Sequence, residues 1–385
     1  MRPDMRICLY TETALPKIGG QELVVDALAR QFQKLGQDVC VLAPYPRRLR
    51  TCDASFPYPI YRHPRFFSTR LLVSWYRWWL LRLRRRFPFD VLHCHGVYPP
   101  GYLAALGRHH LGVPTLITSH GGDIRRGNVR LAKPVLQKRY QQALQNADVL
   151  VSISRFTHDN FRRLHPDARI VTIPNGVDPE PFAVPVPRPE NLDAGIRSRD
   201  YILFLGRLKK RKGVDLLLQA LAQVPANGKV QLVIGGDGEE RSTLETLAKT
   251  LKVTDRVRFL GAVHGPVKTY LLQNALCTTM PSRDWEAFPL VVLESYAAGT
   301  PVLGTRIPGL EDLVQPGKTG WLVRPESPQD LAGALMRIIA DSAGSQSLRS
   351  AVLEHVRGYS WQAVAGRHVE LYQELLSSRK LAKTG

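Results

Sequence analysis

The chain has 385 residues, which is too many for one ordinary hydrophobic core, so two domains are expected. A hydrophobic content of 44% and a charged content of 22% describe a soluble globular protein, and no apolar run is long enough to cross a bilayer. The first residues, Met1–Tyr10, lead into a strand-like run rather than the apolar segment of a signal peptide, which predicts a cytoplasmic protein.

The net charge of +20 is divided unevenly along the chain. Residues 1–180 hold 27 Lys and Arg against 13 Asp and Glu, a balance of +14, whereas residues 181–385 hold 26 against 20, a balance of +6. We therefore expect the first half to face an anionic partner: a membrane surface, a nucleic acid or an acidic substrate.

The cysteines are odd in number and scattered. They show neither the paired spacing of a zinc site nor a CxxC motif. We predict reduced, mostly buried thiols at Cys8, Cys40, Cys52, Cys94 and Cys277.

Short strand-like runs alternate with helical patterns through the first half of the chain. The strand candidates are Met5–Tyr10, Asp38–Ala43, Val91–His95, Thr115–Ser119, Val149–Ile153 and Arg169–Ile173. Helical patterns fit between them, for example over Glu22–Leu35 and Leu136–Gln145. This order predicts parallel strands joined by crossover helices, which is an open, doubly wound sheet.

A proline-rich stretch then interrupts the alternation. Residues 179–189 read PEPFAVPVPRP, with five prolines in eleven residues, which excludes a helix or an inner strand and predicts a linker over residues 181–195. After it the alternation restarts, with strand candidates at Tyr201–Leu205, Val230–Ile234, Arg256–Leu260, Ala275–Met280, Pro301–Gly304 and Gly320–Val323.

The predicted fold is therefore α/β, with two Rossmann-like, doubly wound domains over residues 1–180 and 196–360. Ligands of such sheets bind beyond the carboxyl ends of the strands, so we expect the two domains to face each other across a cleft. The last segment, residues 361–385, has apolar residues at helical spacing from Trp361 to Ser377. We expect this helix either to pack against the second domain or to cross back to the first.

The stretch from Phe66 to Phe87 breaks the pattern and reads FFSTRLLVSWYRWWLLRLRRRF. On a helix, a broad apolar arc forms from Leu71, Leu72, Trp75, Tyr76, Trp79, Leu80 and Leu83. The opposite side holds Ser74, Arg77, Arg84 and Arg85, although Arg82 and Arg86 intrude on the apolar arc. Such a helix suits a membrane interface, with aromatic rings at headgroup depth and guanidinium groups on lipid phosphates. The residues predicted to contact the membrane are Arg70, Trp75, Trp78, Trp79, Arg82, Arg84, Arg85 and Arg86.

Two other interpretations of residues 66–87 remain. One is a crossover helix with a buried apolar face and a basic, solvated end. The other is a nucleic-acid surface, which we disfavour because no helix-turn-helix, RRM or zinc module accompanies the stretch.

Gly19 and Gly20 follow the first predicted strand and precede the first predicted helix. They would let a phosphate approach the backbone at a helix N-terminus, although a simple turn is the alternative. His120 ends another predicted strand, where a polar side chain is well placed for a substrate; a buried structural histidine is the alternative. His93 and His95 lie at the neighbouring strand end, but no carboxylate or cysteine spacing supports a metal site with His120, and we expect none.

The loop GRLKKRKG, residues 206–213, follows the first predicted strand of the second half and holds five cations. Some of them must be solvated. A fixed pair at a strand's carboxyl end is nevertheless what a diphosphate leaving group needs, because it neutralises the charge that develops as the bond to that group breaks. Gly236 lies in a glycine turn of the same kind after the next strand.

The stretch PSRDWEAFPLVVLE, residues 281–294, carries Glu286 and Glu294 in a loop that turns into a helix. Pro289 suits the first helical position, where a missing N–H costs nothing. Such a place offers backbone N–H groups to an anion and carboxylates to hydroxyl groups. Phosphates together with hydroxyls suggest a sugar nucleotide.

Taken in order, these motifs resemble the family-4 retaining glycosyltransferases of the GT-B fold over nearly the whole chain. The matching pieces are Gly19-Gly20, Ser119-His120-Gly121-Gly122-Asp123, Ser152-Ile153-Ser154, Ile173-Pro174-Asn175-Gly176-Val177-Asp178, Gly206-Arg207, Lys212-Gly213, Gly236-Asp237-Gly238, Pro281-Ser282, the pair Glu286/Glu294, Gly309, Glu311, Gly317, Gly320 and Leu322. No single piece is decisive, but the ordered set is highly specific.

The resemblance implies roles for the second-domain residues. Arg207 and Lys212 would bind the donor diphosphate. Glu294 would hold the ribose hydroxyls, and Glu286 would lie by the 3- and 4-hydroxyls of the donor sugar. Gly236 would belong to the same donor site.

The resemblance also implies roles for the first domain. His120 would lie near the anomeric carbon and the sugar's 6-hydroxyl, and Gly19 and Gly20 would let a loop close over the phosphates. Such enzymes generally need no metal or other cofactor, and retention is explained by front-face attack without a protein nucleophile. Domain closure would make the proline-rich linker a hinge.

One departure from the family pattern concerns the donor loop. Many relatives have Gly-Phe-Gly after the first glutamate, whereas this chain has Ala287-Phe288-Pro289. Because Pro289 has no N–H, the amides of Phe288, Leu290 or Val291 would bind the sugar or phosphate instead.

The predicted function is hexose transfer, with retention, from a UDP- or GDP-linked sugar to a lipid-linked or glycan acceptor in cell-envelope or exopolysaccharide synthesis. The enzyme would be peripheral on the inner face of the plasma membrane, with no nucleic-acid partner. The alternatives are a GT-B-fold sugar-nucleotide epimerase and a non-catalytic, membrane-associated protein that binds sugar nucleotides. The sequence names neither the base, the sugar, the linkage nor the acceptor.

Overall fold

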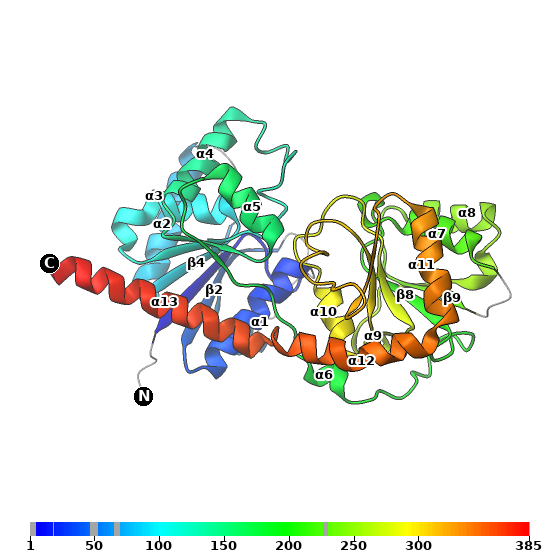
Figure 1. Ribbon diagram of the computed structural model, residues 1–385. Helices are drawn as coiled ribbons and strands as arrows, with labels where there is room; N and C mark the ends of the chain where they lie inside the picture. The colour runs from blue at the N-terminus through cyan, green and yellow to red at the C-terminus, as the bar shows by residue number, and fades with distance from the viewer. Residues whose placement is uncertain (1–4, 18, 47–52, 65–69, 226–229, 385) are drawn as a thin grey trace. The chain divides into compact units, whose positions relative to one another are not determined.

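The computed structural model describes residues 5–17, 19–46, 53–64, 70–225 and 230–384. The chain forms two compact units, Met1–Asn175 with Trp361–Gly385, and Gly176–Ser360. Each unit is built on a parallel β-sheet with helices packed against it (Figure 1). The α/β prediction with two Rossmann-like domains is therefore confirmed.

Within the described residues, the first unit holds a seven-stranded sheet in the order β3-β2-β1-β4-β5-β6-β7. Its strands are β1 (Arg6–Thr11), β2 (Asp38–Pro44), β3 (Ile60–His63), β4 (Val91–His95), β5 (Thr115–Thr118), β6 (Val149–Ser152) and β7 (Ile170–Thr172). Six of them match predicted runs to within a residue or two. The prediction missed β3, a four-residue edge strand between Pro59 and Pro64, because flanking prolines make so short a run look like a loop.

The helices of the first unit lie on both faces of this sheet. They are α1 (Gly20–Lys34), η1 (Asp53–Ser55), α2 (Arg70–Arg86), η2 (Val97–Gly101), α3 (Tyr102–Leu111), α4 (Pro134–Gln145), α5 (Arg155–Leu164) and α13 (Trp361–Thr384). Alternate strand residues such as Cys8 and Leu42 pack in one core with α2, α3 and α4. Their neighbours point to the opposite face, where α1 and α13 lie side by side (Figure 1).

Helix α13 therefore joins the first unit, the second of the two placements that the sequence allowed. Its Tyr372 hydroxyl is hydrogen-bonded to His93 Nδ1 on β4 (2.6 Å), and its Arg379 donates to both carboxylate oxygens of Asp148 (3.0 Å each). Tyr372 is fully buried. These contacts fix the helix to the sheet along much of its length.

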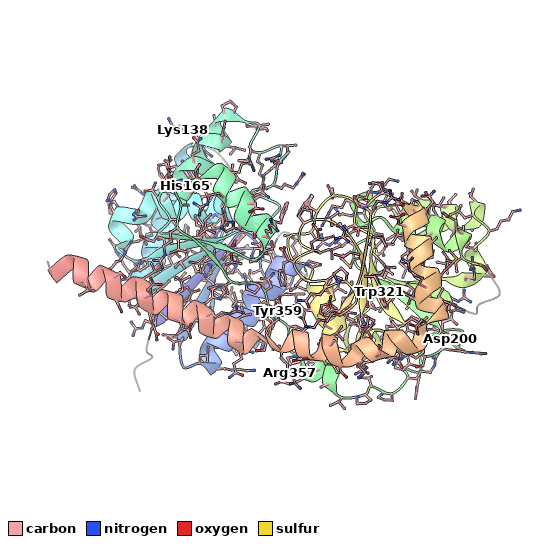
Figure 2. All side chains as sticks on the ribbon, in the orientation of Figure 1. Lys138, His165, Asp200, Trp321, Arg357 and Tyr359 are labelled. Atoms are coloured by element: carbon pink, nitrogen blue, oxygen red, sulfur yellow. The ribbon has the colours of Figure 1, made fainter. Side chains whose placement is uncertain are left out.

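Within the described residues, the second unit holds a six-stranded sheet in the order β10-β9-β8-β11-β12-β13. Its strands are β8 (Tyr201–Leu205), β9 (Gln231–Gly235), β10 (Val257–Gly261), β11 (Cys277–Met280), β12 (Val302–Thr305) and β13 (Gly320–Val323), the edge strand that carries Trp321 (Figure 2). Each matches a predicted run.

Two helical layers cover this second sheet. The helices are α6 (Glu180–Ala183), η3 (Lys210–Lys212), α7 (Val214–Gln223), α8 (Arg241–Thr250), η4 (Thr254–Arg256), α9 (Gly265–Asn274), α10 (Leu290–Ala297), α11 (Pro328–Ala340) and α12 (Ser342–Arg357). Ile202 and Phe204 face the core that contains α7, α8 and α11, whereas Tyr201 and Leu203 face α9. Burial on both faces explains why these strands read as continuous apolar runs.

The proline-rich stretch differs from its prediction as a linker without helix. It begins with the short helix α6, since Pro181 lies in the first turn, where its missing N–H and fixed φ are tolerated. Gln273 of α9 then holds it by donating to the carbonyls of Phe182 (2.8 Å) and Val184 (2.7 Å) and accepting from the amide of Val186 (2.9 Å). Residues 181–195 are thus part of the second unit, whose boundary lies earlier, at Gly176.

The described cysteines, Cys8, Cys40, Cys94 and Cys277, are buried free thiols, as predicted. Cys52 lies outside the described residues. In the described part of the chain, no helix combines the length and the apolar character that a membrane span requires.

Candidate functional site

Glu286 is a buried carboxylate in the loop between β11 and α10, with only 4% of its surface exposed. Its Oε1 accepts hydrogen bonds from Lys212 Nζ (2.6 Å) and Ser282 Oγ (2.6 Å), and Arg211 Nη1 lies 3.5 Å away. Burial by itself raises the pKa of Glu286, but the Lys212 and Arg211 charges and the hydrogen bonds outweigh it, so the pKa is lowered. The carboxylate is therefore ionised at neutral pH.

Lys212 reaches Glu286 from the loop that follows β8, the strand hydrogen-bonded to β11. Burial lowers the pKa of its ammonium group, and Glu286 counteracts that effect. The next residue, Gly213, has φ +68°, and a Cβ there would lie 1.9 Å from the carbonyl oxygen of Pro281. Only glycine allows the two loops to pack so closely.

Two arginines extend this cluster. The Arg211 guanidinium lies 4.6 Å from the centroid of the Trp285 ring, and its Nη1 donates to the Trp285 carbonyl (2.9 Å). Arg207 is exposed, and its charge contributes to the lowered pKa of Lys212. Arg207, Arg211 and Lys212 together outnumber the single carboxylate of Glu286, so the ends of β8 and β11 keep a surplus of positive charge suited to an anion.

The glycine turn after β9 supports the same loop. The Gly236 amide donates to the Gly261 carbonyl (2.6 Å), and the Leu208 amide donates to the Asp237 carbonyl (2.9 Å). The backbone around Arg207 is thereby pinned to the neighbouring strand end. Gly236 thus lies beside the cation loop, where the sequence placed it.

Glu294 lies on α10 and has a different partner from Glu286. Its Oε1 accepts a hydrogen bond from Lys268 Nζ of α9 (2.6 Å). Lys268 is not among the predicted site residues, because 26 positions separate it from Glu294 and only the packing of α9 against α10 brings the two together. No spacing rule would have found this pair.

The start of α10 is fixed by buried residues. Phe288 is buried, and its ring centroid lies 6.2 Å from that of Tyr359, which is labelled in Figure 2. Pro289 occupies the N-cap position of α10, one residue before the first helical position that the sequence predicted for it, so Leu290 and Val291 are the first two helical residues. Amides in a first turn have no acceptor within their own helix, which leaves these two for a ligand.

A second glycine contact holds the backbone of Glu286. The Glu286 amide donates to the Pro308 carbonyl (3.0 Å). Gly309, which follows Pro308, has φ +86°. A Cβ at Gly309 would lie 1.8 Å from the Glu286 carbonyl oxygen, so a larger residue would displace the loop. This explains why the sequence pattern after β12 contains glycine.

Gly19 and Gly20 lie at the start of α1 in the first unit. Gly19 is the extended N-cap residue and Gly20 the first helical residue. A Cβ on Gly20 would meet no described atom within 4 Å, so packing within the described residues does not require glycine there.

His120 lies two residues after the end of β5, also in the first unit. Its Nε2 lies 3.1 Å from Nδ1 of the buried His95, which is the neighbouring residue that the metal hypothesis considered. Burial lowers the pKa of His120 to about 4, although Glu22 counteracts it, so the ring is neutral at pH 7. Asp123 fixes the loop by accepting from the Val97 amide (2.8 Å) and from Ser119 Oγ.

In the part of the chain that the structure describes, no group of three or more His, Cys, Asp or Glu side chains is arranged to hold a metal ion. The residues near His120 that the sequence suggested, His93 and His95, are instead engaged with protein partners.

Helix α2 contains the aromatic and basic residues of the predicted membrane helix, and the structure divides the expected apolar arc. Of the arc residues, Tyr76, Leu80 and Leu83 are buried in the core, as in a crossover helix, whereas Trp75 is 40% exposed. Trp78, which lies outside the predicted arc, is 49% exposed. The predicted apolar arc is wider than the face of the helix that is buried, because sequence periodicity does not show how much of such an arc the core covers. Residues 66–69, and the side chain of Arg70, lie outside the described residues.

The arginines of α2 also divide. Arg82 lies over the exposed Trp78 ring (5.3 Å to the centroid), while Arg84 and Arg86 lie over Phe89 (5.0 Å) and Tyr61 (5.5 Å) of the same unit. Arg85 is exposed, and Trp79 is partly buried. The outward surface of α2 therefore includes Trp75, Trp78, Arg82 and Arg85, and Ser74, Arg77 and Arg86 of the same helix are exposed as well.

Comparison with protein families gives one match in each half of the chain. The model described as "Glycosyltransferase Family 4" matches residues 18–181, and the model described as "Glycosyl transferases group 1" matches residues 194–354.

Individual proteins agree with these matches. A D-inositol 3-phosphate glycosyltransferase of Corynebacterium urealyticum is 32% identical over 77% of this chain and 68% of its own length. The N-acetyl-alpha-D-glucosaminyl L-malate synthase of Bacillus anthracis is 25% identical over 96% of this chain and 98% of its own. The solved structure of Anabaena HepE in complex with UDP has a TM-score of 0.81 at 19% identity, covering 96% of this chain and all of that one. The chain belongs to the family-4 glycosyltransferases of the GT-B fold.

Proposed function

We propose that this glycosyltransferase moves a hexose, with retention and without a metal ion, from a UDP- or GDP-linked sugar to a lipid-linked or glycan acceptor. The observation that carries the proposal is the buried Lys212–Glu286 pair, flanked by Arg207 and Arg211 at the ends of β8 and β11. A surplus of fixed cations at strand ends suits a diphosphate.

In this proposal, Arg207 and Lys212 neutralise the charge that develops on the diphosphate as its bond to the anomeric carbon breaks. The acceptor oxygen forms its bond on the same face of the sugar, and the leaving phosphate takes the acceptor's proton. His120 acts near the anomeric carbon and the 6-hydroxyl, and Gly19 and Gly20 give the phosphates access to the backbone. The cations take the place of a metal ion.

The two glutamates hold hydroxyl groups in this scheme. Lys212, Ser282 and Arg211 all contact Oε1 of Glu286, and Lys268 contacts Oε1 of Glu294. Among the described residues, neither Oε2 has a hydrogen-bonding partner. Each Oε2 is thereby available to accept from a hydroxyl, on the donor sugar for Glu286 and on the ribose for Glu294.

The likeness to HepE in complex with UDP supports a nucleotide-sugar donor. The two curated relatives carry names that refer to different acceptors, a malate and an inositol phosphate, so likeness alone assigns none to this chain.

The test is incubation of the purified protein with labelled UDP- and GDP-sugars, with and without a membrane extract. Transfer that keeps the anomeric configuration of the donor sugar, unaffected by a chelator, is the expected result. An isomerised donor without transfer would indicate an epimerase, and nucleotide binding without any turnover would indicate a non-catalytic protein. Either outcome would overturn the proposal.

We also propose that the outward surface of α2 rests on an anionic membrane on the cytoplasmic side. Exposed Trp75 and Trp78 suit the headgroup region, and Arg82 and Arg85 suit lipid phosphates. The first half of the chain, with its balance of +14, adds long-range attraction.

Vesicle sedimentation tests this surface. The double variant Trp75→Ser/Trp78→Ser should lose most binding to vesicles rich in anionic lipid, with the melting temperature unchanged. Val129→Ser/Val135→Ser is the matched control, since both valines are exposed on the same unit. Equal binding of the tryptophan variant and the wild type would rule the surface out.

A further inference from the structure

Four histidine rings lie in a row in the first unit. The ring centroids of His368 and His93 are 5.5 Å apart, those of His93 and His95 4.6 Å, and those of His95 and His120 5.4 Å. His93, His95 and His368 are buried, whereas His120, in the loop after β5, is partly exposed. The row thus runs from the core to the candidate catalytic histidine.

The hydrogen bonds within the row are unequal. His93 is bonded through both nitrogens, Nδ1 to the Tyr372 hydroxyl (2.6 Å) and Nε2 to Thr118 Oγ1 (2.7 Å). His95 has a single side-chain bond, from Nδ1 to His120 Nε2 (3.1 Å). Its Nε2 is buried and has no partner among the described residues.

The backbone of His95 is also held. The side-chain amide of Gln21 on α1 donates to the His95 carbonyl (3.1 Å) and to Thr11 Oγ1 (2.9 Å). The His95 ring lies between those of His93 and His120 and is nearly coplanar with that of His120 (18° between the planes), as an N–H···N bond requires, so His95 has a fixed place from which to act on His120.

One proton lies between the two bonded nitrogens, because burial keeps both rings neutral by lowering the pKa of each. If the shared proton belonged to Nε2 of His120, the single ring proton of His95 would have to be on its Nε2, which would be a buried N–H without an acceptor. If His95 donates it, Nε2 is a bare acceptor. Unpaired buried N–H groups are rarer in proteins than unpaired acceptors, which favours the second arrangement.

We propose that His95 is a positioning residue that donates its Nδ1–H to His120 Nε2 and so fixes His120 as the Nδ1–H tautomer. No described residue is hydrogen-bonded to His120 Nδ1. His120 therefore presents a hydrogen-bond donor to a substrate oxygen and does not accept a proton from it. The consequence for transfer rests on the proposed function, whereas the tautomer itself does not.

The tautomer is measured by nitrogen-15 NMR on the full chain labelled at histidine, at neutral pH. The His120 signals are assigned by their loss in His120→Gln. The expected spectrum shows a protonated Nδ1 and an unprotonated Nε2 for His120. A protonated Nε2 in the wild type would overturn the proposal, whatever the activity assays show.

Three variants separate positioning from packing. His95→Phe keeps a flat ring but removes the donor, so a mixture of His120 tautomers and an about tenfold lower kcat with little change in donor KM are expected. His95→Asn places an amide N–H near the former Nδ1 and should restore the tautomer and most of kcat. His368→Phe alters the same row without removing the bond between His95 and His120, so it should leave the His120 tautomer and kcat unchanged.

Equal losses of kcat in His95→Phe and His368→Phe, with the His120 tautomer unaltered, would reduce His95 to a packing role and refute the proposal. If His95→Phe fails to fold, the wild-type spectrum and the His95→Asn variant still decide it. A complete absence of sugar transfer with every donor would count against the proposed function, while the NMR result would stand on its own.

Discussion

Lys212 keeps its charge in a largely buried position because Glu286 lies 2.6 Å away. Two isolated charges in such a place would each cost several kcal/mol, roughly, and pairing with additional hydrogen bonds offsets that cost. Ser282 and Arg211 supply these further contacts to the carboxylate. The charged groups of the site, Lys212, Arg211 and Glu286, are therefore in place before any substrate binds.

Replacing Lys212 by methionine tests the leaving-group role. Lys212→Met should lower kcat/KM about 10²- to 10³-fold, the usual cost of removing one donor that stabilises developing negative charge. Steady-state assays with the preferred nucleotide sugar measure it. Lys249→Met, at an exposed position of α8, is the control and should retain full activity. An unchanged rate in Lys212→Met would contradict the role.

Lys268 and Glu294 are expected to act as a unit in donor binding. Without the ammonium group, Glu294 loses the contact at Oε1 that orients Oε2. Lys268→Met should weaken nucleotide binding about tenfold in calorimetry, which corresponds to about 1.4 kcal/mol.

The double-mutant cycle checks the coupling of this pair. Glu294→Gln alone should weaken binding by a similar factor, and the double variant should be little worse than either. Additive losses would show that the two residues act independently of each other.

At the scale of elements, α2 and α13 have similar spacing of apolar residues but use these residues differently. In α2, Tyr76 and Leu80 bind the helix to the core while Trp75 and Trp78 remain outside. Their near-identical apolar character hides this division in the sequence. In α13, Tyr372 and His368 meet His93 of β4 at a polar contact inside the core.

The hydroxyl of Tyr372 should contribute measurably to stability. Tyr372→Phe leaves the buried His93 Nδ1 without its partner, which should cost about 1–3 kcal/mol in the free energy of unfolding. Urea denaturation followed by tryptophan fluorescence measures the change. Tyr45→Phe, at a residue that is 52% exposed, should alter stability little. Equal stabilities of Tyr372→Phe and the wild type would show that this bond contributes nothing net.

At the scale of the whole molecule, buried histidines link stability to pH. Burial lowers the pKa of His63, His120 and His368 from 6.5 to about 4. Between these values the unfolded chain binds more protons than the folded chain. The stability that neutral histidines confer is therefore complete above about pH 6.5 and is lost as the pH falls toward 4.

The variant His368→Phe isolates one of these contributions. A shift from 6.5 to about 4 corresponds to about 3 kcal/mol for a single buried ring. The free energy of unfolding of this variant should fall less steeply than that of the wild type between pH 6.5 and 4. His110→Gln, on an exposed side chain, should keep the wild-type slope, and a wild-type slope in His368→Phe would contradict the link.

The sequence by itself determined the two α/β units and most of their strands, because strands buried on both faces must be apolar runs bounded by polar turns. It also determined the family, since the ordered set of motifs, Gly213 and Gly309 among them, can be read from the residue types alone. The physical reason for these glycines lies in the tertiary structure, because a Cβ at Gly213 or Gly309 would lie within 2 Å of a carbonyl oxygen of another loop.

Only the tertiary structure decided the partners. The pairing of Glu294 with Lys268, the bond from His95 to His120, the docking of α13 on β4 and the packing of residues 181–195 on α9 all join residues far apart in the chain. The exposure of Trp75 and burial of Tyr76 were decided in the same way. Each depends on which surfaces come into contact when the helices pack, and local sequence patterns do not specify those contacts.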